Sequence, residues 1–308
     1  MCIRDRTEVL RMLRPGFGLK DAPRAWSMAL ERALADFGLR PACTDEQLYL
    51  KHDSEGKLVM VLTVHVDDLK GAGAPGEAER LVKHLETRFG ELKREEGSFD
   101  HVGIRHEQRP DGSIVMHQHA YAQSLSVIDM SGHEFADNDD VAGESLTKSY
   151  HTLLGGAAWL TMTCPAICVY VSYLQRHSKG PTMKHIKDLN RLVRWIKRCP
   201  QEIVYEKLRS PTKLVCVTDS SFSAGDTQGL VMRGCLLMLV EQNTDGSPTG
   251  KCQLIDWFSR RQPHVCRSTF AAELHAALDG LNQACWCSAC CTRYRMELRV
   301  PRLSLIHI

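Results

Sequence analysis

Apolar residues recur with two different periods along the chain. Spacings of three and four residues are typical of amphipathic helices, whereas short runs rich in β-branched and aromatic residues are typical of strands. The helical spacing predicts helices at 26–37, 77–89, about 120–128, 150–163, 166–176 and 183–197. The β-rich runs predict strands at 47–51, 58–66, 214–219, 230–240 and 253–258, with two more on either side of Pro110–Gly112. A last helix begins at Ser268 or Thr269, because either hydroxyl can cap its first turn. The pattern predicts an α+β chain with strands near both ends and helices between them.

The apolar run 58–66 ends in two adjacent carboxylates, Asp67 and Asp68, before a Gly71–Gly73 break. Because Asp is a poor strand residue and a good turn residue, we expect both to lie on the tight turn of a hairpin. Two adjacent carboxylates repel each other, and a divalent cation such as Mg²⁺ relieves that repulsion. An ordinary Asp-Asp turn explains the same pair, so the pair alone does not distinguish a metal site from a turn.

A second pair of carboxylates follows the same logic near the end of the chain. Asp219 ends a predicted strand, and Glu273 lies in the first turns of the last helix. Together they form a candidate site for joint metal binding. Asp279 lies six residues beyond Glu273 and therefore on another part of the helix surface, so we interpret it as structural.

Composition is that of an ordinary globular chain, with 43% hydrophobic and 25% charged residues and a net charge of +2. We expect no membrane partner, because no apolar run is long enough to span a bilayer. Thirteen cysteines without a secretory leader predict reduced thiols and a cytoplasmic or nuclear rather than secreted protein. Residues 176–209 hold ten Lys/Arg and three Asp/Glu, a local net charge of +7. Such a segment suits a phosphate backbone, and a solvated helix face explains it equally well.

The cysteines near the end of the chain are candidates for a zinc site. Four of them fall within Cys285–Cys291, and the spacing from Cys287 to Cys290 is that of a zinc knuckle. A structural zinc site needs four ligands from separated pairs, and no second Cys/His pair follows. The composition therefore favours scattered thiols over a metal centre.

The two terminal hexapeptides, Met1–Arg6 and Leu303–Ile308, correspond to opposite readings of one transposase end sequence used in preparing sequencing libraries. We therefore interpret both as adaptor-encoded and leave them out of the predicted fold. On this interpretation, the natural protein continues at both ends.

Six segments in a fixed order carry a family resemblance. The loop Gly16–Trp26 resembles the "YGLKQAPRAW" signature of copia-type retrotransposon reverse transcriptases, and His65–Asp68 resembles their "YVDD" box. The others are Tyr150–Leu160, which resembles "Y..LVGSLLYL", Thr218–Ser223, which resembles "SDADWA", Trp257–Gln262, which resembles "WSSKKQ", and Ser268–Leu278, which resembles "SSTEAEYIAL". Each segment is weak alone, and the six in order resemble the reverse transcriptase and ribonuclease H region of such an element.

The resemblance implies an RNA-directed DNA polymerase with a palm and thumb, followed by a ribonuclease H-like α/β domain. Asp67 and Asp68 would then bind two Mg²⁺ ions for nucleotidyl transfer. Asp219 and Glu273 would bind two more for hydrolysis of an RNA–DNA hybrid. Lys20, Arg24 and His65 would lie on the nucleotide and template side. The implied partners are template-primer, RNA–DNA hybrid, deoxynucleoside triphosphates and other parts of the polyprotein, in a virus-like particle.

The resemblance divides the chain into four parts: palm and thumb at 7–128, a linker at 129–149, a basic helical connection at 150–209, and a ribonuclease H-like domain at 210–296. It also shows departures, since His65 stands where the family usually has Tyr. The family's other palm aspartate belongs upstream of Gly16, and its later ribonuclease H carboxylates belong beyond the last helix. We therefore expect an incomplete enzyme fragment. The alternative is an inactive relic or a co-opted nucleic-acid-binding protein.

Overall fold

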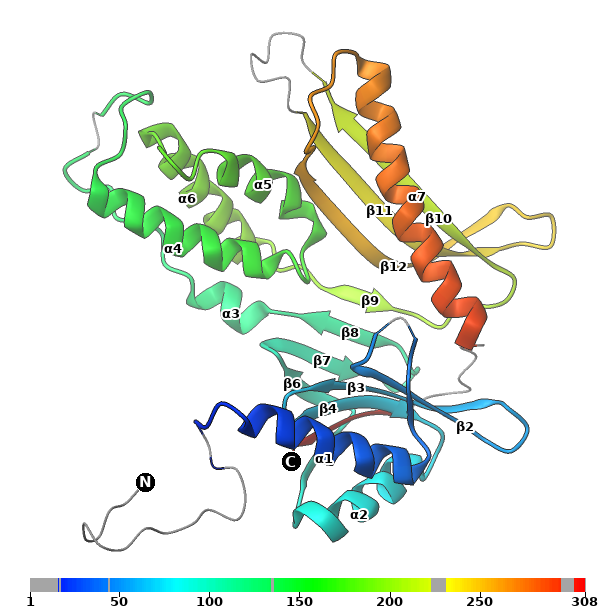
Figure 1. The fold of residues 1–308 in the computed structure, drawn as a ribbon. Coiled ribbons are helices and arrows are strands. Elements are labelled where there is room, and N and C mark those ends of the chain that lie inside the picture. Colours follow the sequence, from blue (N-terminus) through cyan, green and yellow to red (C-terminus); the bar gives the residue numbers. More distant parts are fainter. Residues whose placement is uncertain are drawn as a thin grey trace, which may run out of the picture. The chain divides into compact units, whose positions relative to one another are not determined.

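The computed structural model of the chain describes residues 16, 18–43, 45–133, 136–222, 231–294 and 302–307. It is mixed α/β with three antiparallel sheets (Figure 1). The chain divides into two compact units, the first made of Met1–Glu96 with Tyr294–Ile308 and the second of Gly97–Arg293. This division at residue 97 differs from the boundary expected at 129–149. The first hexapeptide, Met1–Arg6, lies outside the described residues.

The first unit is built on a six-stranded antiparallel sheet in the order β1-β2-β3-β4-β13-β5. Its strands are β1 (Arg40–Pro41), β2 (Leu48–His52), β3 (Leu58–His65), β4 (Asp68–Gly73), β5 (Lys93–Glu96) and β13 (Arg302–His307). Strands β2 and β3 confirm the two strands predicted from the apolar runs. Strands β1, β5 and β13 were not predicted, because they are short, charged or placed by distant pairing.

Two amphipathic helices supply the core of this unit. Helix α1 (Ala22–Phe37) ends where Gly38 adopts φ +95°, and α2 (Glu77–Phe89) has the predicted bounds. Both confirm the helical spacing, because their apolar residues recur every three or four positions on one face. The buried cluster consists of Leu30, Ala33, Leu34, Leu39, Tyr49, Met60, Leu62, Leu69, Leu81, Leu85, Leu92 and Ile306.

The Gly-containing segment after the carboxylates continues as a strand, so the expected break at Gly71–Gly73 is wrong. A Cβ atom on Gly71 would lie 2.9 Å from the carbonyl oxygen of Val61 and 2.9 Å from the Leu62 side chain. Glycine is therefore needed for close approach of β4 to β3 rather than for a turn. Residue 68 pairs with His65 and begins β4, which leaves Val66 and Asp67 as the loop.

Residues 303–307 of the C-terminal hexapeptide, which was left out of the predicted fold, are part of the sheet. Strand β13 lies between β4 and β5 and pairs with both in antiparallel register. Leu305 is fully buried, and Ile306 packs in the core cluster at 1% exposure. In the sheet order this apolar segment stands between β4 and β5 and is the pairing partner of each.

The second unit begins with a four-stranded antiparallel sheet in the order β6-β7-β8-β9. Its strands are β6 (Ser98–His101), β7 (Ile104–Gln108), β8 (Ile114–His117) and β9 (Ile203–Tyr205). Strands β7 and β8 confirm the hairpin predicted around Pro110–Gly112. Strand β9 comes almost 90 residues later in the chain and pairs with β8, so residues on both sides of the expected linker share one sheet.

Helices form the middle of this unit: α3 (His119–Ser124), α4 (Glu144–Leu160), α5 (Cys168–Arg176) after a 3₁₀ turn at Pro165–Ile167, and α6 (Met183–Arg198). The expected linker 129–149 packs against them, since Ala142 is buried in their core and Met130 and Ala136 pack against it. The amide N–H of Ala142 donates to Pro181 (2.9 Å), and that of Met183 donates to Asp140 (2.9 Å). The segment is polar in composition, yet its backbone is held in place by hydrogen bonds.

The last part of the unit is a three-stranded antiparallel sheet followed by a helix, as the sequence predicted. Strands β10 (Thr212–Ser221), β11 (Met232–Gln242) and β12 (Pro248–Arg261) precede α7 (Thr269–Tyr294). The Ala271 N–H donates to Ser268 Oγ (3.1 Å), which confirms the predicted cap. No helix among the described residues is long and apolar enough to cross a membrane.

Candidate active site

The carboxylates Asp67 and Asp68 lie at the end of the β3–β4 hairpin in the first unit. Asp67 is exposed on the two-residue loop, and Asp68 is half-buried as the first residue of β4. Val66, the other loop residue, has φ +59°. A β-branched residue rarely adopts a positive φ, which costs on the order of 1–3 kcal/mol. The surrounding structure must therefore hold this loop in place.

Trp26, in helix α1, holds this loop in place. Its indole Nε1–H donates a hydrogen bond of 2.8 Å to the carbonyl oxygen of Val66. The Trp26 ring also packs against Phe89 of α2, with the ring centroids 5.1 Å apart. The end of the loop Gly16–Trp26 is thereby fixed to the carboxylate turn, 40 residues further along the chain. Sequence reasoning quoted Trp26 as part of a motif and missed this role, because no local pattern indicates which carbonyl an indole will meet.

The two cations predicted for this site belong to the segment Gly16–Trp26. Lys20 and Arg24 are exposed at the start of α1, and Asp21 is the residue at the helix N-cap. A helix N-terminus carries unpaired N–H groups and a partial positive charge, which attract phosphate oxygens. The Trp26 contact attaches α1, which begins beside Lys20 and carries Arg24, to the turn that carries the two carboxylates.

Strand alternation decides which other groups share a face with Asp68. Residues at even numbers of β4 point away from the buried Leu69, so Lys70 lies on the same face as Asp68. Burial lowers the pKa of the Lys70 ammonium. His65 is the register partner of Asp68 across the hairpin and is exposed. The face of the carboxylate turn therefore also presents an imidazole and an ammonium group.

Among the described residues, no three His, Cys, Asp or Glu side chains come close enough together to hold a metal ion. The donor set at the turn is nevertheless suited to Mg²⁺, which prefers oxygen ligands and binds through one or two carboxylates plus substrate phosphates. Asp67 and Asp68 could supply the protein's share of such a site.

The second pair of predicted carboxylates lies where β10 meets α7. Helix α7 covers one face of the sheet, and its Glu273 accepts a hydrogen bond from the Ser220 N–H of β10 (3.3 Å). Asp219 lies one residue earlier on β10 and is exposed on the other face, where it lines a pocket with Val217 and Leu236. The Glu273 carboxylate therefore lies beside the backbone of the residue next to Asp219, while the Asp219 side chain points away from α7.

Asp279 has the structural role expected of it. Its carboxylate pairs with Arg233 (2.7 Å) and Arg260 (3.2 Å), which lie on neighbouring strands β11 and β12. Helix α7 packs so closely here that a Cβ on Gly280 would lie 2.7 Å from Cys216 Sγ. These contacts fix α7 to the sheet and leave the Asp279 carboxylate neutralised.

Comparison with known proteins places the first candidate site in a family. Residues 3–139 match the family described as Reverse transcriptase (RNA-dependent DNA polymerase). The Retrovirus-related Pol polyproteins from transposons RE1 and RE2 of Arabidopsis thaliana are each 24% identical to this chain, in alignments that cover 97% of it. The chain carries a copia-type retrotransposon reverse transcriptase region.

The matches cover different shares of the chain and of the known proteins. The chain spans 20% of the length of the two polyproteins. An uncharacterized mitochondrial protein of Arabidopsis thaliana is 26% identical over 46% of this chain and 55% of its own length. No solved structure matches the chain. The family match contains Asp67, Asp68, Lys20, Arg24 and His65, whereas Asp219 and Glu273 lie beyond its end.

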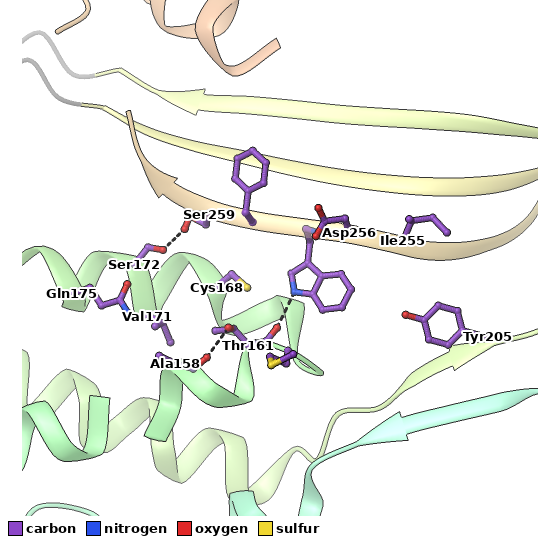
Figure 2. A pocket seen from close by; sticks show the side chains of 13 residues that line it. Ala158, Thr161, Cys168, Val171, Ser172, Gln175, Tyr205, Ile255, Asp256 and Ser259 are labelled. Carbon is purple, nitrogen blue, oxygen red and sulfur yellow. Dashed lines mark hydrogen bonds between the residues drawn. The ribbon is translucent and has the colours of Figure 1, made fainter. Parts of the chain in front are cut away.

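A cavity of about 400 Å³ in the second unit lies outside the reverse transcriptase match (Figure 2). It is enclosed by α4, α5 and β12, where Trp257 Nε1–H donates to the carbonyl oxygen of Thr161 (2.8 Å). Burial raises the pKa of the Cys168 thiol in its wall to about 11, so this thiol is protonated at neutral pH. The cavity contains none of the predicted site residues.

The cysteine cluster adds no metal centre among the side chains that are described. Cys285 is exposed and Cys287 is buried on α7, so the two face different surroundings. The side chains of Cys290 and Cys291 lie outside the described part of the chain.

Proposed function

We propose that the first unit is part of the nucleotidyl-transfer centre of an RNA-directed DNA polymerase, with Asp67 and Asp68 as its metal-binding carboxylates. The observation that carries the proposal is the Trp26–Val66 hydrogen bond (2.8 Å), which fixes the cationic loop to the carboxylate turn. The family match over residues 3–139 supports the same reading. On this proposal, the six-stranded sheet with α1 and α2 is the palm.

Each residue of this centre would have a role that follows from its position. Asp67, exposed on the turn, would be the more direct ligand, and half-buried Asp68 would assist it. When bound, Mg²⁺ would lower the pKa of the primer hydroxyl and neutralise charge on the triphosphate. Lys20 and Arg24 would meet the phosphates of the nucleotide or template at the N-terminus of α1. Trp26 would keep the turn in one conformation, and His65 would flank the nucleotide.

The test is primer extension by the polyprotein segment that contains this chain. Asp67→Asn removes one negative charge without changing size, so extension should fall by at least about a hundredfold while template-primer binding stays within about twofold. Asp36→Asn is the matched control, because Asp36 is an exposed carboxylate on α1 of the same unit. Extension at the normal rate by Asp67→Asn would refute the assignment.

The alternative function is nucleic-acid binding without catalysis, by an inactive relic. It predicts that the unsubstituted segment binds template-primer and extends nothing. The same experiment therefore separates the two functions, because the first requires extension that depends on Asp67.

Hydrolysis of an RNA–DNA hybrid has weaker support within the chain. The three antiparallel strands followed by α7 are the arrangement expected of a ribonuclease H-like domain. Glu273 meets the Ser220 N–H next to Asp219, but both carboxylates lie beyond the family match over residues 3–139. Polymerisation is therefore the function that the geometry supports best.

A further inference from the structure

The cavity of about 400 Å³ in the second unit has the size of a small-molecule site (Figure 2). Ligand pockets in proteins measure about 300–1,000 Å³ and are lined mostly by apolar and aromatic side chains, with a few polar groups. Side chains of both kinds line this cavity: Met162, Val171, Ser172, Gln175, Tyr205 and Trp257. Its size and its lining are therefore suited to a small organic molecule.

The cavity offers a ligand no free charge. Of the residues that line it, only Asp256 carries a charge at neutral pH. Its Oδ1 accepts from the Trp257 N–H (2.8 Å), and its Oδ2 accepts from the side-chain amide of Gln283 on α7. Both carboxylate oxygens are thus engaged by groups of the protein. Because a charge that is buried without a partner is costly, the cavity favours an uncharged ligand.

Two polar side chains remain available to such a ligand. Within the part of the chain that is described, neither the Tyr205 hydroxyl nor the Gln175 side-chain amide has a hydrogen-bond partner. Figure 2 shows the Tyr205 hydroxyl pointing toward Thr161, across the cavity. Burial raises the pKa of Tyr205, so its hydroxyl stays protonated at neutral pH and can donate a hydrogen bond. A ligand with a hydrogen-bond acceptor would satisfy it.

The walls of the cavity are joined to each other by hydrogen bonds. The Trp257 Nε1–H of β12 donates to the carbonyl oxygen of Thr161 at the end of α4 (2.8 Å). Two residues further along β12, the carbonyl oxygen of Ser259 accepts from the Ser172 hydroxyl of α5. Both helices are therefore attached to the strand, and the cavity is formed before a ligand enters, which lowers the cost of binding.

We propose that this cavity binds an uncharged aromatic molecule of about two fused rings that carries a hydrogen-bond acceptor. Aromatic rings pack favourably against other rings and against thioether sulfur, and Trp257, Tyr205 and Met162 supply both. At about 30 Å³ for each water of the liquid, the cavity has the volume of about thirteen waters, which suits a molecule of about ten to fifteen non-hydrogen atoms. Its acceptor would meet the Tyr205 hydroxyl.

This proposal is separate from the assignment of the carboxylate turn, because it rests on different residues in the other unit. Asp67→Asn should leave binding in the cavity unchanged. Conversely, a substitution that fills the cavity should abolish this binding whether or not the chain can extend a primer. Failure of one proposal can therefore be told from failure of the other.

The test is isothermal titration calorimetry of the full chain with 2-naphthol as the probe, at neutral pH. The probe should bind with a Kd below about 1 mM. Naphthalene-2-sulfonate has the same rings and a negative charge, and it should bind at least about tenfold more weakly. Decahydro-2-naphthol keeps the carbon skeleton and the hydroxyl but is not flat, and it should bind at least about threefold more weakly. No saturable binding of 2-naphthol would overturn the proposal, and so would equal affinity for either control probe.

The thiol of Cys168 reports where the probe binds. It lines the cavity, and burial raises its pKa to about 11, so its alkylation by iodoacetamide is slow and is followed by mass spectrometry. At four times the Kd, 2-naphthol should slow this alkylation by about fivefold, because only about a fifth of the cavities stay empty. Cys252 is exposed and outside the cavity, so its rate should not change. An unchanged rate at Cys168 would refute this location.

Two substitutions test the contacts. Tyr205→Phe keeps the ring and removes the hydroxyl, so 2-naphthol should bind about two- to tenfold more weakly. Tyr170→Phe is the matched control, since Tyr170 is exposed on α5 and does not line the cavity, and it should leave the affinity unchanged. Ala158→Leu places a larger side chain in the wall and should weaken binding at least about tenfold. If this variant does not fold, Tyr205→Phe still decides: equal affinities in the two tyrosine variants would overturn the proposal.

Discussion

Replacing Ile306 by alanine tests the most unexpected feature of the first unit, which is the strand β13 between β4 and β5. Ile306 is 1% exposed and packs in the same core cluster as Leu69 and Leu81. Truncating a fully buried isoleucine to alanine costs about 2–5 kcal/mol, from lost burial and the cavity that remains. A value of about 3 kcal/mol would reduce the equilibrium constant for folding of this unit more than a hundredfold.

The effect should be local as well as energetic. Strand β13 supplies the register partners of β4 from Asp68 to Gly73 on one side and of β5 on the other. Hydrogen exchange followed by mass spectrometry should therefore show faster exchange in β4 and β5 of the variant. Urea unfolding of the full chain should show a lower midpoint for the transition of the first unit, because the two units can unfold separately.

Ile255→Ala is the matched control for this substitution. Ile255 lies on β12 of the second unit and is 40% exposed, so its truncation should cost less than about 1 kcal/mol. If Ile306→Ala leaves the exchange of β4 and the urea midpoint unchanged, β13 does not belong to the sheet. The interpretation of Leu303–Ile308 as a segment outside the fold would then stand.

Two further predictions concern the hydrogen bond at the turn and the histidines of the second unit. Trp26→Phe keeps a ring against Phe89 but removes the bond to Val66, so unfolding free energy should fall by about 1 kcal/mol and the turn should exchange faster. Phe89→Leu, which keeps that bond, should leave exchange at the turn unchanged, and the opposite pattern would contradict the role of Trp26. Burial and the nearby His185, Arg176 and Lys184 lower the pKa of His177, so below its ordinary value of about 6.5 the unfolded chain binds more protons. The melting temperature should therefore fall as pH drops from 7.5 to 5.5, and by less in His177→Gln; an equal fall in both would refute this cause.

Much of the fold followed from local patterns. The helix at 77–89 has the predicted bounds, and the helices around 183–197 and 26–37 differ from prediction by a few residues at their ends. Their apolar residues recur every three or four positions, and this spacing is a property of adjacent residues that no distant contact needs to supply. The carboxylate pair was found for the same reason, because it stands directly after a strand.

The elements that were missed depend on distant parts of the chain. Strand β9 has only three residues and is a strand because β8 pairs with it. The expected linker is polar in composition, yet Ala142 within it is buried, and Asn190 bonds twice to Ile128 just before it. Short strands and polar segments carry little local signal, so their state is decided by pairing and packing.

For the candidate site, the sequence by itself predicted which residues would carry the chemistry, and the order of its motifs indicated the family. It placed Asp67 and Asp68 beside a cationic loop only by analogy. The tertiary structure decided how α1 is attached to the turn, through the bond from Trp26 to Val66, and it placed Glu273 against the Ser220 N–H, next to Asp219. The physical reason is the distance along the chain over which each effect acts. Periodicity and turn chemistry depend on a few neighbouring residues. Strand register, the orientation of side chains and contacts 40 residues apart are settled only when the chain packs.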